Sequence, residues 1–435
     1  MFDTLKNAWK IADLRKKIIF TIAIILLIRV GTGFLIPYLD PSAVRTATNT
    51  DNPFAMMNMM SGGALGQTTV FALGVQPYIN ASIIIQLLSV VFPSLEALSK
   101  QGEEGKKKMD LITKLTTIGI ALLQSIAYYM FMVNSGLVVQ RGGFAQALVA
   151  TTVIAILMAG TCLVVWLGEE INTKGIGNGI SMVIFAGILT NFPAMFAQLY
   201  AYLRDGIIFG QWKLIIGAPV LFIMYFAMIV FIIFMTNAER KIPVQYAKRV
   251  VGRKMYGGQS TYIPIKVNMS GVMPVIFASS IMQIPTLLTL FITPKETGFF
   301  HWLVNPINGI MTPNSIVYGI LFFILVYAFN FFNTAMNYNP VEIANDLRKN
   351  SGAIPGFRPG KSTSDYLKLV VSKINVIGGL FLALIATLPI FVQIFTGMNF
   401  AMAGTSVIIV VGVALDTVKA MESQMMMRHY KGFLE

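Results

Sequence analysis

The sequence predicts an all-α polytopic membrane protein with ten transmembrane helices. Three observations lead to this class: the composition, the lengths of the apolar stretches and the distribution of basic residues. Of the 435 residues, 55% are apolar and only 12% are charged, and the mean hydropathy is +0.70. Soluble domains contain about 25% charged residues. The chain therefore lacks the polar surface that a soluble fold of this size needs.

Ten stretches reach or approach the ~20 apolar residues that cross a hydrocarbon layer of ~30 Å. In chain order they are 18–39, 70–92, 115–133, 147–167, 180–200, 214–236, 272–292, 315–336, 374–396 and 401–416. The last is short, and we expect its helix to continue past Asp416 as an amphipathic extension. The first follows a basic N-terminus, as in a signal peptide, but it is too long for one and lacks a small-residue cleavage site. We therefore expect a retained first span.

Basic residues are distributed unevenly between the two sides of the predicted membrane. Ten spans place 27 of the 33 Lys and Arg in the termini and in loops on one side, including the long loops 237–271 and 337–373. Because basic residues accumulate in cytoplasmic loops, both termini are predicted to be cytoplasmic. The net charge of +14 then reflects topology and an affinity for anionic lipids or an acidic partner surface, not specific binding of nucleic acid.

Two segments far apart in the chain are nearly identical. GVQPYINASIIIQ starts at Gly74, GVMPVIFASSIMQ starts at Gly271, and they share eight positions. Chance is an alternative, because an apolar alphabet is small, but each segment opens the second span of a group of five. Five crossings are an odd number, so a second copy would be inverted relative to the first. We therefore predict two inverted-repeat halves, 1–205 and 206–435, with the functional path between them.

A short apolar segment precedes the second span. Pro53 to Leu65 is rich in methionine and too short to cross the membrane. One interpretation is an interfacial helix on the outer surface. The other is a half-helix that folds back through the flexible glycines that follow it and acts as a movable stopper.

Catalytic chemistry is sparse in this sequence. The chain contains two histidines and one cysteine, Cys162, with no spacing typical of a metal site, so we expect no enzyme, no metal, no cofactor and no intrachain disulfide. An ion-coupled transporter needs a charged site near mid-membrane, and Arg29 is the one clear charge inside a span; we interpret it as a helix or partner contact. A channel is the favoured class, and a small-solute transporter is the alternative.

Several segments resemble the bacterial SecY family, the channel subunits of the Sec protein translocon. The similarity extends from about residue 13 to about residue 424. Its most specific segments are SGGALGQTTVFALGVQPYINASIIIQLL, GEEINTKGIGNGISM, VQYAKRVVGRKMYGGQSTYIPIKVNMSGVMPVIFASSI, NPVEIANDLRKNSGAIPGFRPGKST and GTSVIIVVGVALD. The resemblance implies a clamshell of two halves around an hourglass pore in the bacterial plasma membrane. Unfolded secretory polypeptides would cross through this pore, and transmembrane segments would leave sideways through a gate between spans 2 and 7.

The same resemblance implies roles for particular residues. The pore ring would consist of Ile79, Ile83, Ile180, Ile184, Ile276 and Ile409, with Ile408 as the alternative to Ile409. The lateral gate would include Asn80, Gln86, Ser280, Gln283 and Ile284. The plug would span 55–66, with Met56, Met57, Met59, Met60, Gly62 and Gly63.

The implied partners are SecE, SecG, the ATPase SecA, ribosomes, signal sequences and nascent polypeptides. Docking of SecA and the ribosome would use the two long cytoplasmic loops through Arg249, Arg253, Lys254 and Arg358. The alternative for these charges is a topology signal without a partner.

Overall fold

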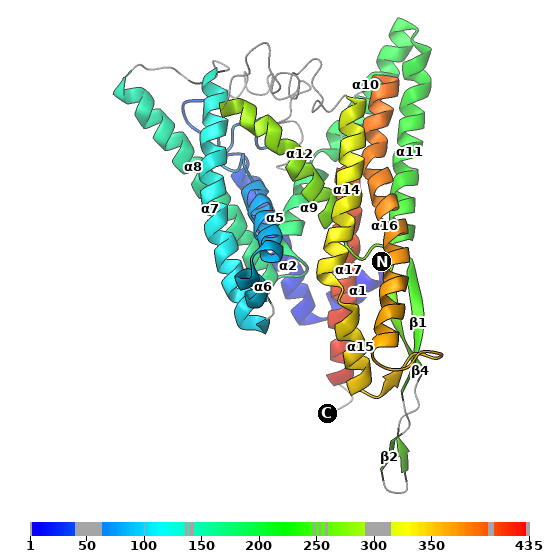
Figure 1. Cartoon of the computed structure of the whole chain (residues 1–435). Coiled ribbons are helices and arrows are strands. Elements are labelled where there is room, and N and C mark those ends of the chain that lie inside the picture. Colours follow the sequence, from blue (N-terminus) through cyan, green and yellow to red (C-terminus); the bar gives the residue numbers. More distant parts are fainter. Residues whose placement is uncertain are drawn as a thin grey trace.

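A computed structural model of the chain describes residues 2–39, 63–99, 101–134, 138, 143–246, 249–251, 254–256, 260–291, 315–398 and 404–431. Long helices run side by side, with a small sheet and both termini toward one end (Figure 1). The helices are α1 (Phe2–Lys10), α2 (Ala12–Gly31), α5 (Gln76–Val91), α6 (Pro93–Ser99), α7 (Gly102–Asn134), α8 (Phe144–Lys174), α9 (Gly179–Leu189), α10 (Phe192–Phe209), α11 (Trp212–Asn237), α12 (Met273–Phe291), α14 (Ile316–Asn337), α15 (Pro340–Lys349), α16 (Lys361–Thr396) and α17 (Gly404–Lys431). The strands are β1 (Glu239–Tyr246), β2 (Arg249–Val251), β3 (Lys254–Tyr256), β4 (Ser260–Lys266) and β5 (Gly352–Ala353).

The polytopic helical class is confirmed, since each of the ten predicted stretches contains a helix. Among the described residues, seven helices are long and apolar enough to cross a membrane, or eight if the sharply bent pair α5 and α6 is one span. This count joins α9 to α10 and α14 to α15. Of the remaining stretches, α2 carries several charged residues, and α12 provides a shorter apolar helix, Met273–Pro285.

The first predicted stretch is too long at its C-terminal end. Helix α2 stops at Gly31, and Leu35 pairs with Thr69 in an antiparallel bridge. Beyond this point the backbone pairs with the segment before α5: the Ile36 amide donates to the Thr68 oxygen at 2.8 Å and the Val70 amide to the Phe34 oxygen at 3.0 Å. Gly31 lets Phe71 pack close, since a Cβ there would lie 2.0 Å from its ring. The apolar residues after Gly31 therefore form turns and bridges, which hydropathy alone does not reveal.

The fifth predicted span is two helices rather than one. α9 begins after Asn178, whose side chain accepts a hydrogen bond from the Ser181 amide at 3.1 Å. It ends at Leu189, and α10 begins at Phe192 with Pro193 in its first turn. Proline is accepted at that position because its missing N–H would have no partner there. In contrast, α17 continues to Lys431, so the predicted extension past Asp416 is confirmed.

Two β-sheets that the sequence analysis did not predict, one of three strands and one of two, lie in the two long loops. β1 pairs with both β4 and β5 in antiparallel register, and β2 pairs with β3. On β1, Ile242 and Val244 are buried in a cluster with Ile265, Leu347 and Leu367. The sheet thus joins the loop after α11 to the start of α16 and makes this end of the molecule a folded platform.

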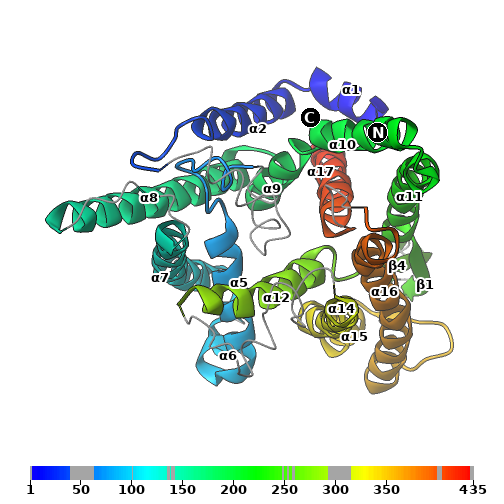
Figure 2. The ribbon, with the colours of Figure 1, turned by 90° about the horizontal axis from the view of Figure 1, so that it is seen from above.

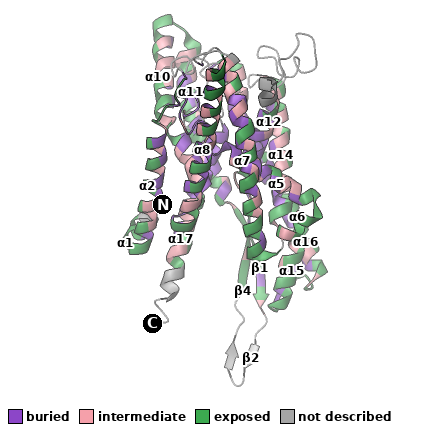
Figure 3. Cartoon of the chain, turned by 90° about the vertical axis from the view of Figure 1, so that its left-hand side faces the viewer, coloured by how far each residue is buried: buried purple, intermediate pink, exposed green. Residues whose placement is uncertain are grey.

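Viewed from above, the helices surround a central region (Figure 2). α2, α5, α7 and α8 lie on one side, and α11, α14, α16 and α17 on the other. α12 packs on α14 in one direction and on α5 and α7 in the other. Buried residues concentrate on the inner faces and exposed ones on the outer faces and ends (Figure 3). Exposed apolar side chains such as Ile223, Phe234 and Phe209 are suited to contact with lipid.

The two helices that carry the repeated segments run in opposite senses. α5 leads down into α6, whereas α12 starts after β4 near the sheet and runs toward the other end (Figure 1). This is the relation expected of an inverted repeat. The division at residue 205 remains a proposal.

Candidate functional site

A groove separates α5 and α7 from α12. Its cavity has a volume of about 210 Å³ and is almost entirely apolar. The lining residues come from α5 (Asn80, Ile83, Ile84), α7 (Ile120, Leu123, Gln124, Ala127) and α12 (Ser280, Ile281, Ile284). Each repeated segment therefore forms part of one wall of the cavity, as predicted for a gate between spans 2 and 7.

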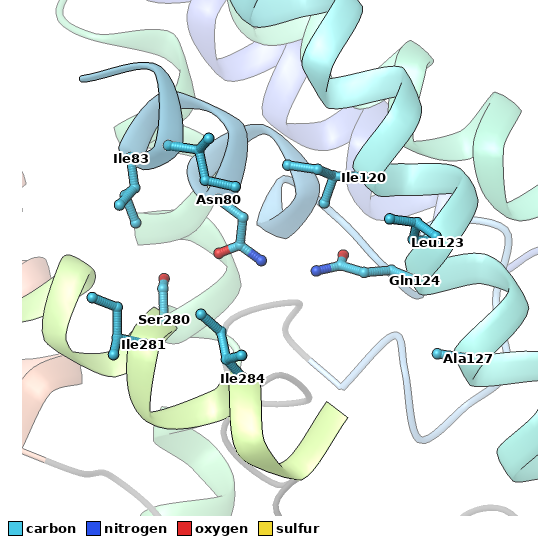
Figure 4. A pocket seen from close by; sticks show the side chains of 10 residues that line it. Asn80, Ile83, Ile120, Leu123, Gln124, Ala127, Ser280, Ile281 and Ile284 are labelled. Atoms are coloured by element: carbon cyan, nitrogen blue, oxygen red, sulfur yellow. The ribbon is translucent and has the colours of Figure 1, made fainter. Parts of the chain in front are cut away.

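Three polar side chains point into this apolar groove from different helices (Figure 4). The Asn80 Oδ1, Gln124 Oε1 and Ser280 Oγ atoms are buried and have no hydrogen-bond partner among the described residues. A buried polar atom without a partner costs about 1–3 kcal/mol. The contact that closes the groove thus leaves polar atoms without hydrogen bonds. A different polar or helical surface could take the place of one of its walls.

One hydrogen bond crosses from α5 to α12. The Gln76 side-chain amide donates to Gln283 Oε1 at 3.3 Å, and both residues are buried. The Gln283 amide nitrogen has no partner among the described residues, so this connection is also incomplete. A single neutral hydrogen bond contributes about 0.5–1.5 kcal/mol.

The five predicted gate residues divide into three groups. Asn80, Ser280 and Ile284 line the groove. Gln283 bonds across it, whereas Gln86 donates to Asn333 of α14 at 3.5 Å instead of to α12.

Sequence reasoning missed Gln76 and Gln124. Gln124 lies in the middle of the apolar stretch 115–133, and a polar residue inside a membrane span is a signal that could have been used. Gln76 faces Met273 in the alignment of the two repeated segments, so the search for shared positions passed over it.

The isoleucines predicted to form the pore ring are all buried in one continuous apolar cluster. They come from α5 (Ile79, Ile83), α9 (Ile180, Ile184), α12 (Ile276) and α17 (Ile408, Ile409). Burial does not separate Ile408 from Ile409. Gly404, one turn before Ile408, packs against Ile385 and Pro389 of α16. Because residues four apart share one face of a helix, Ile408 lies on the face of α17 that is turned toward α16. This orientation favours Ile409 for the ring.

Ile180 packs differently from the other predicted ring residues. A Cβ on Gly168 of α8 would lie 2.8 Å from the Ile180 Cδ1 atom, so the tip of this side chain contacts α8. Ile184, one turn later, is buried in the same cluster. It is the stronger ring candidate on α9.

The predicted plug lies mostly outside the described residues, which exclude Met56, Met57, Met59, Met60 and Gly62. Gly63 is described and has φ of +85°. Just after it, the Tyr128 hydroxyl of α7 donates to the Leu65 backbone oxygen at 2.7 Å. The C-terminal end of the predicted plug is therefore attached to α7.

The strands β2 and β3 and the segment between α15 and α16, which hold the described docking residues, lie at the end of the molecule that carries the sheets (Figure 1). The backbones of Arg249 and Lys254 form part of β2 and β3, and Arg253 lies outside the described residues. Arg358 is exposed between Gly356 and Gly360, which have φ of +86° and +110°. Phe357 stacks on Tyr366 of α16 at 4.1 Å and fixes the turn that presents Arg358.

Arg29 is bonded inside the bundle. Its guanidinium donates to the Ala186 backbone oxygen of α9 at 2.5 Å, one of the terminal carbonyls that an α-helix leaves without a partner. The predicted helix contact is thus observed. Within the described ranges, no three His, Cys, Asp or Glu residues form a group that could hold a metal ion.

A helical bundle with opposed repeat helices, a lateral groove and a buried apolar cluster between its two sides is typical of a polytopic channel-like membrane protein. The family model described as SecY matches residues 69–418. Relatives named protein translocase subunit SecY are 43% identical in Streptomyces coelicolor, 42% in Streptomyces galbus and 41% in Mycobacterium tuberculosis, over the full length of both chains in each case. The chain belongs to the SecY family.

Solved structures show the same fold at low sequence identity. A SecY structure determined to study the plug domain matches with a TM-score of 0.69 at 20% identity. The structure of a protein-conducting channel matches with a TM-score of 0.67, also at 20% identity. Each match covers 94% of this chain and 92% of the other. Sec61 in a canine ribosome-channel complex matches with a TM-score of 0.64 at 19% identity.

Proposed function

We propose that this chain is the central protein-conducting channel of the Sec translocon. It passes unfolded secretory polypeptides across the bacterial plasma membrane and releases transmembrane segments sideways into lipid. In a member of the SecY family, the observation that carries this proposal is the incomplete contact between α5 and α12. The small-solute transporter is dropped, because neither the family nor a charged mid-membrane site supports it.

The groove explains how a segment could leave sideways. Its walls are apolar and its polar atoms are not fully bonded, so parting α5 from α12 breaks few favourable contacts. An apolar helix that enters the groove replaces the lost packing with its own side chains, and its backbone groups are already bonded internally. A helical signal sequence or transmembrane segment is therefore the occupant that the groove suits.

The isoleucine cluster explains how the path could close to ions. A constriction of apolar side chains sheds water and blocks ion flow by dewetting. Branched apolar side chains make no sequence-specific bonds, so the same ring accepts chains of any sequence. Ile79, Ile83, Ile184, Ile276 and Ile409 are the residues we assign to this ring, with Ile180 at its edge.

The proposed partners follow from the family and from the sheet-bearing end of the molecule. SecE and SecG would complete the complex in the membrane, SecA would drive export, and ribosomes would deliver membrane proteins. Solved structures of similar fold include Sec61 in a canine ribosome-channel complex and the idle yeast Ssh1 complex bound to the 80S ribosome. Exposed Arg358 lies in the folded platform, and we assign this end to the cytoplasm on the basis of its basic residues.

Purification and reconstitution test this function. We expect two small membrane subunits to co-purify with the chain, and vesicles containing the complex, supplied with SecA and ATP, to import a secretory precursor. A chain that purifies alone, binds a small solute and does not import the precursor would contradict the proposal.

A further inference from the structure

The link that joins β4 to α12 is held by a buried side chain. The Ser270 hydroxyl lies 3.0 Å from the Asn330 backbone oxygen and 2.8 Å from the Thr334 hydroxyl, both on α14. Gly271 follows with φ of +64°, a backbone conformation that favours glycine. The base of α12 thus combines a fixed attachment with a sharp turn.

α16 completes this attachment through Asn375. The Asn330 amide donates to the Asn375 backbone oxygen at 3.1 Å and to its Oδ1 atom at 2.7 Å. The Thr334 hydroxyl lies 2.7 Å from the same Oδ1 atom. Ser270, Asn330, Thr334 and Asn375 are all buried, and we call them the base network. A buried network whose members bond one another holds its helices in one arrangement.

Two adjacent glycines of α16 allow close packing at the same level. A Cβ on Gly378 of α16 would lie 2.2 Å from the Val267 backbone oxygen, and one on Gly379 would lie 2.7 Å from the Asn330 amide nitrogen. The link before α12 and helix α14 therefore both contact the α16 surface directly. Sliding of α12 at its base would break the base network and this packing together.

The other face of α12 is held much less firmly. Toward α5 and α7 it borders the groove, where Asn80, Gln124 and Ser280 leave buried polar atoms without partners among the described residues. Polar groups that are already unsatisfied lose nothing when the helices separate and gain bonds if water enters. α12 should therefore part from α5 and α7 before it leaves α14 and α16.

We propose that the base network is the fulcrum of the groove. It holds the base of α12 on α14 and α16 while the rest of the helix moves against α5 and α7. Ser270 and Thr334 are positioning residues, and their bonds set how readily the groove opens. This inference rests on the proposed function, in which the groove is a gate, but it concerns a motion that can be measured without a transported polypeptide.

Thiol labelling in the groove tests the fulcrum. The probe is a single cysteine, Ser280→Cys, in the full chain carrying Cys162→Ser, labelled with N-ethylmaleimide in membrane vesicles. Buried Ser280 becomes accessible when the groove opens, so the labelling rate follows the open population. We expect Ser270→Ala and Thr334→Val each to raise this rate about fivefold, because a base that is no longer fixed also lets α12 leave α14, a movement that each intact bond opposes by about 1 kcal/mol.

A matched control separates this role from general packing. Thr387 of α16 is also buried, and among the described residues its hydroxyl bonds only to the backbone oxygens of Ala383 and Leu384 in its own helix. We expect Thr387→Val to label at the parent rate and Thr334→Ser, which keeps the hydroxyl, to restore that rate. Combining Ser270→Ala with Thr334→Val should add little, because the two changes remove a shared bond.

Equal labelling rates in Ser270→Ala, Thr334→Val and Thr387→Val, at equal melting temperatures, would overturn the fulcrum. If Thr334→Val does not accumulate in the membrane, Ser270→Ala decides alone, because its smaller change removes only the link to α14. Failure of precursor import in the reconstituted parent would contradict the proposed function, while the labelling rates would still report the motion of α12.

Discussion

Ile276 is the residue at which an exchange of one side chain tests the apolar seal most directly. It lies in the first turn of α12, is buried in the central cluster and belongs to the helix that borders the groove. Ile276→Asn places an amide among apolar side chains, at a cost of about 1–3 kcal/mol to the dry, closed state. We expect the resting ion conductance in a planar bilayer to rise about tenfold, since 1.4 kcal/mol corresponds to a factor of ten.

A lipid-facing isoleucine provides the control for this exchange. Ile324 of α14 is exposed on the outer surface, so Ile324→Asn should lower the amount of inserted protein without changing the conductance per complex. If Ile276→Asn conducts no more than Ile324→Asn, then Ile276 is ordinary helix packing and does not belong to the seal.

Arg358 tests docking independently of conduction. Its exposed position on a turn braced by Phe357 and Tyr366 makes it available to a partner, and a guanidinium binds carboxylates or phosphates through two parallel hydrogen bonds. We expect Arg358→Glu to lower SecA-driven import of a precursor by about tenfold or more, while complex assembly and pore conductance stay unchanged.

The matched charge reversal uses Lys349, which is exposed at the end of α15 and pairs with Asp346 at 3.5 Å. Lys349→Glu changes the net charge equally but alters no residue that we assign to docking. Import that falls equally in both variants would indicate a general effect of charge, and import that falls in neither would leave Arg358 as a topology signal.

At the scale of elements, close helix packing depends on glycines whose neighbours are backbone atoms. A Cβ on Gly160 of α8 would lie 2.0 Å from the Val70 backbone oxygen, whereas Gly119 of α7 has nothing within 4 Å. Gly160→Ala must therefore move α8 away from the segment before α5. We expect it to lower the free energy of unfolding by about 1–3 kcal/mol and Gly119→Ala to leave it unchanged or raised, since Ala favours helix.

Thermal unfolding in detergent, followed by the loss of helical circular dichroism, measures both exchanges. An equal melting temperature for the two glycine variants would show that the α8 contact at Val70 is not tight in the folded protein.

Element positions were predictable from the sequence where hydropathy decides them. Long apolar stretches such as 147–167 and 214–236 predict the membrane helices that the structure shows as α8 and α11. The end of α2 at Gly31 and the strands β1 and β4 were not predicted, because they depend on contacts with Phe71 and with α15 and α16 that lie far away in the chain. The groove could be placed from the repeated segments, but Gln76 and Gln124 required the three-dimensional packing.

At the scale of the whole molecule, we expect the two predicted halves to separate when a polypeptide passes. Cysteines at Asn80 and Ile284, on opposite walls of the groove, joined by a short bismaleimide in a Cys162→Ser chain, would hold α5 and α12 together. We expect import of a precursor and insertion of a membrane protein both to fall by at least about tenfold, because 1.4 kcal/mol of added cost to opening already gives that factor and a covalent link adds far more.

The control for this link joins two helices that should move together. Lys114 of α7 and Glu169 of α8 form an ion pair at 2.9 Å, and both helices lie on the same side of the bundle as α5 (Figure 2). The same reagent on Lys114→Cys with Glu169→Cys should leave import near the uncrosslinked level, since α7 and α8 belong to one predicted half. Full import with α5 and α12 linked would mean that polypeptides pass without the groove opening, and the gate between these helices would have to be abandoned. Loss of import with α7 and α8 linked would instead mean that these two helices move apart during import, so that the boundary between the moving parts lies within the predicted first half.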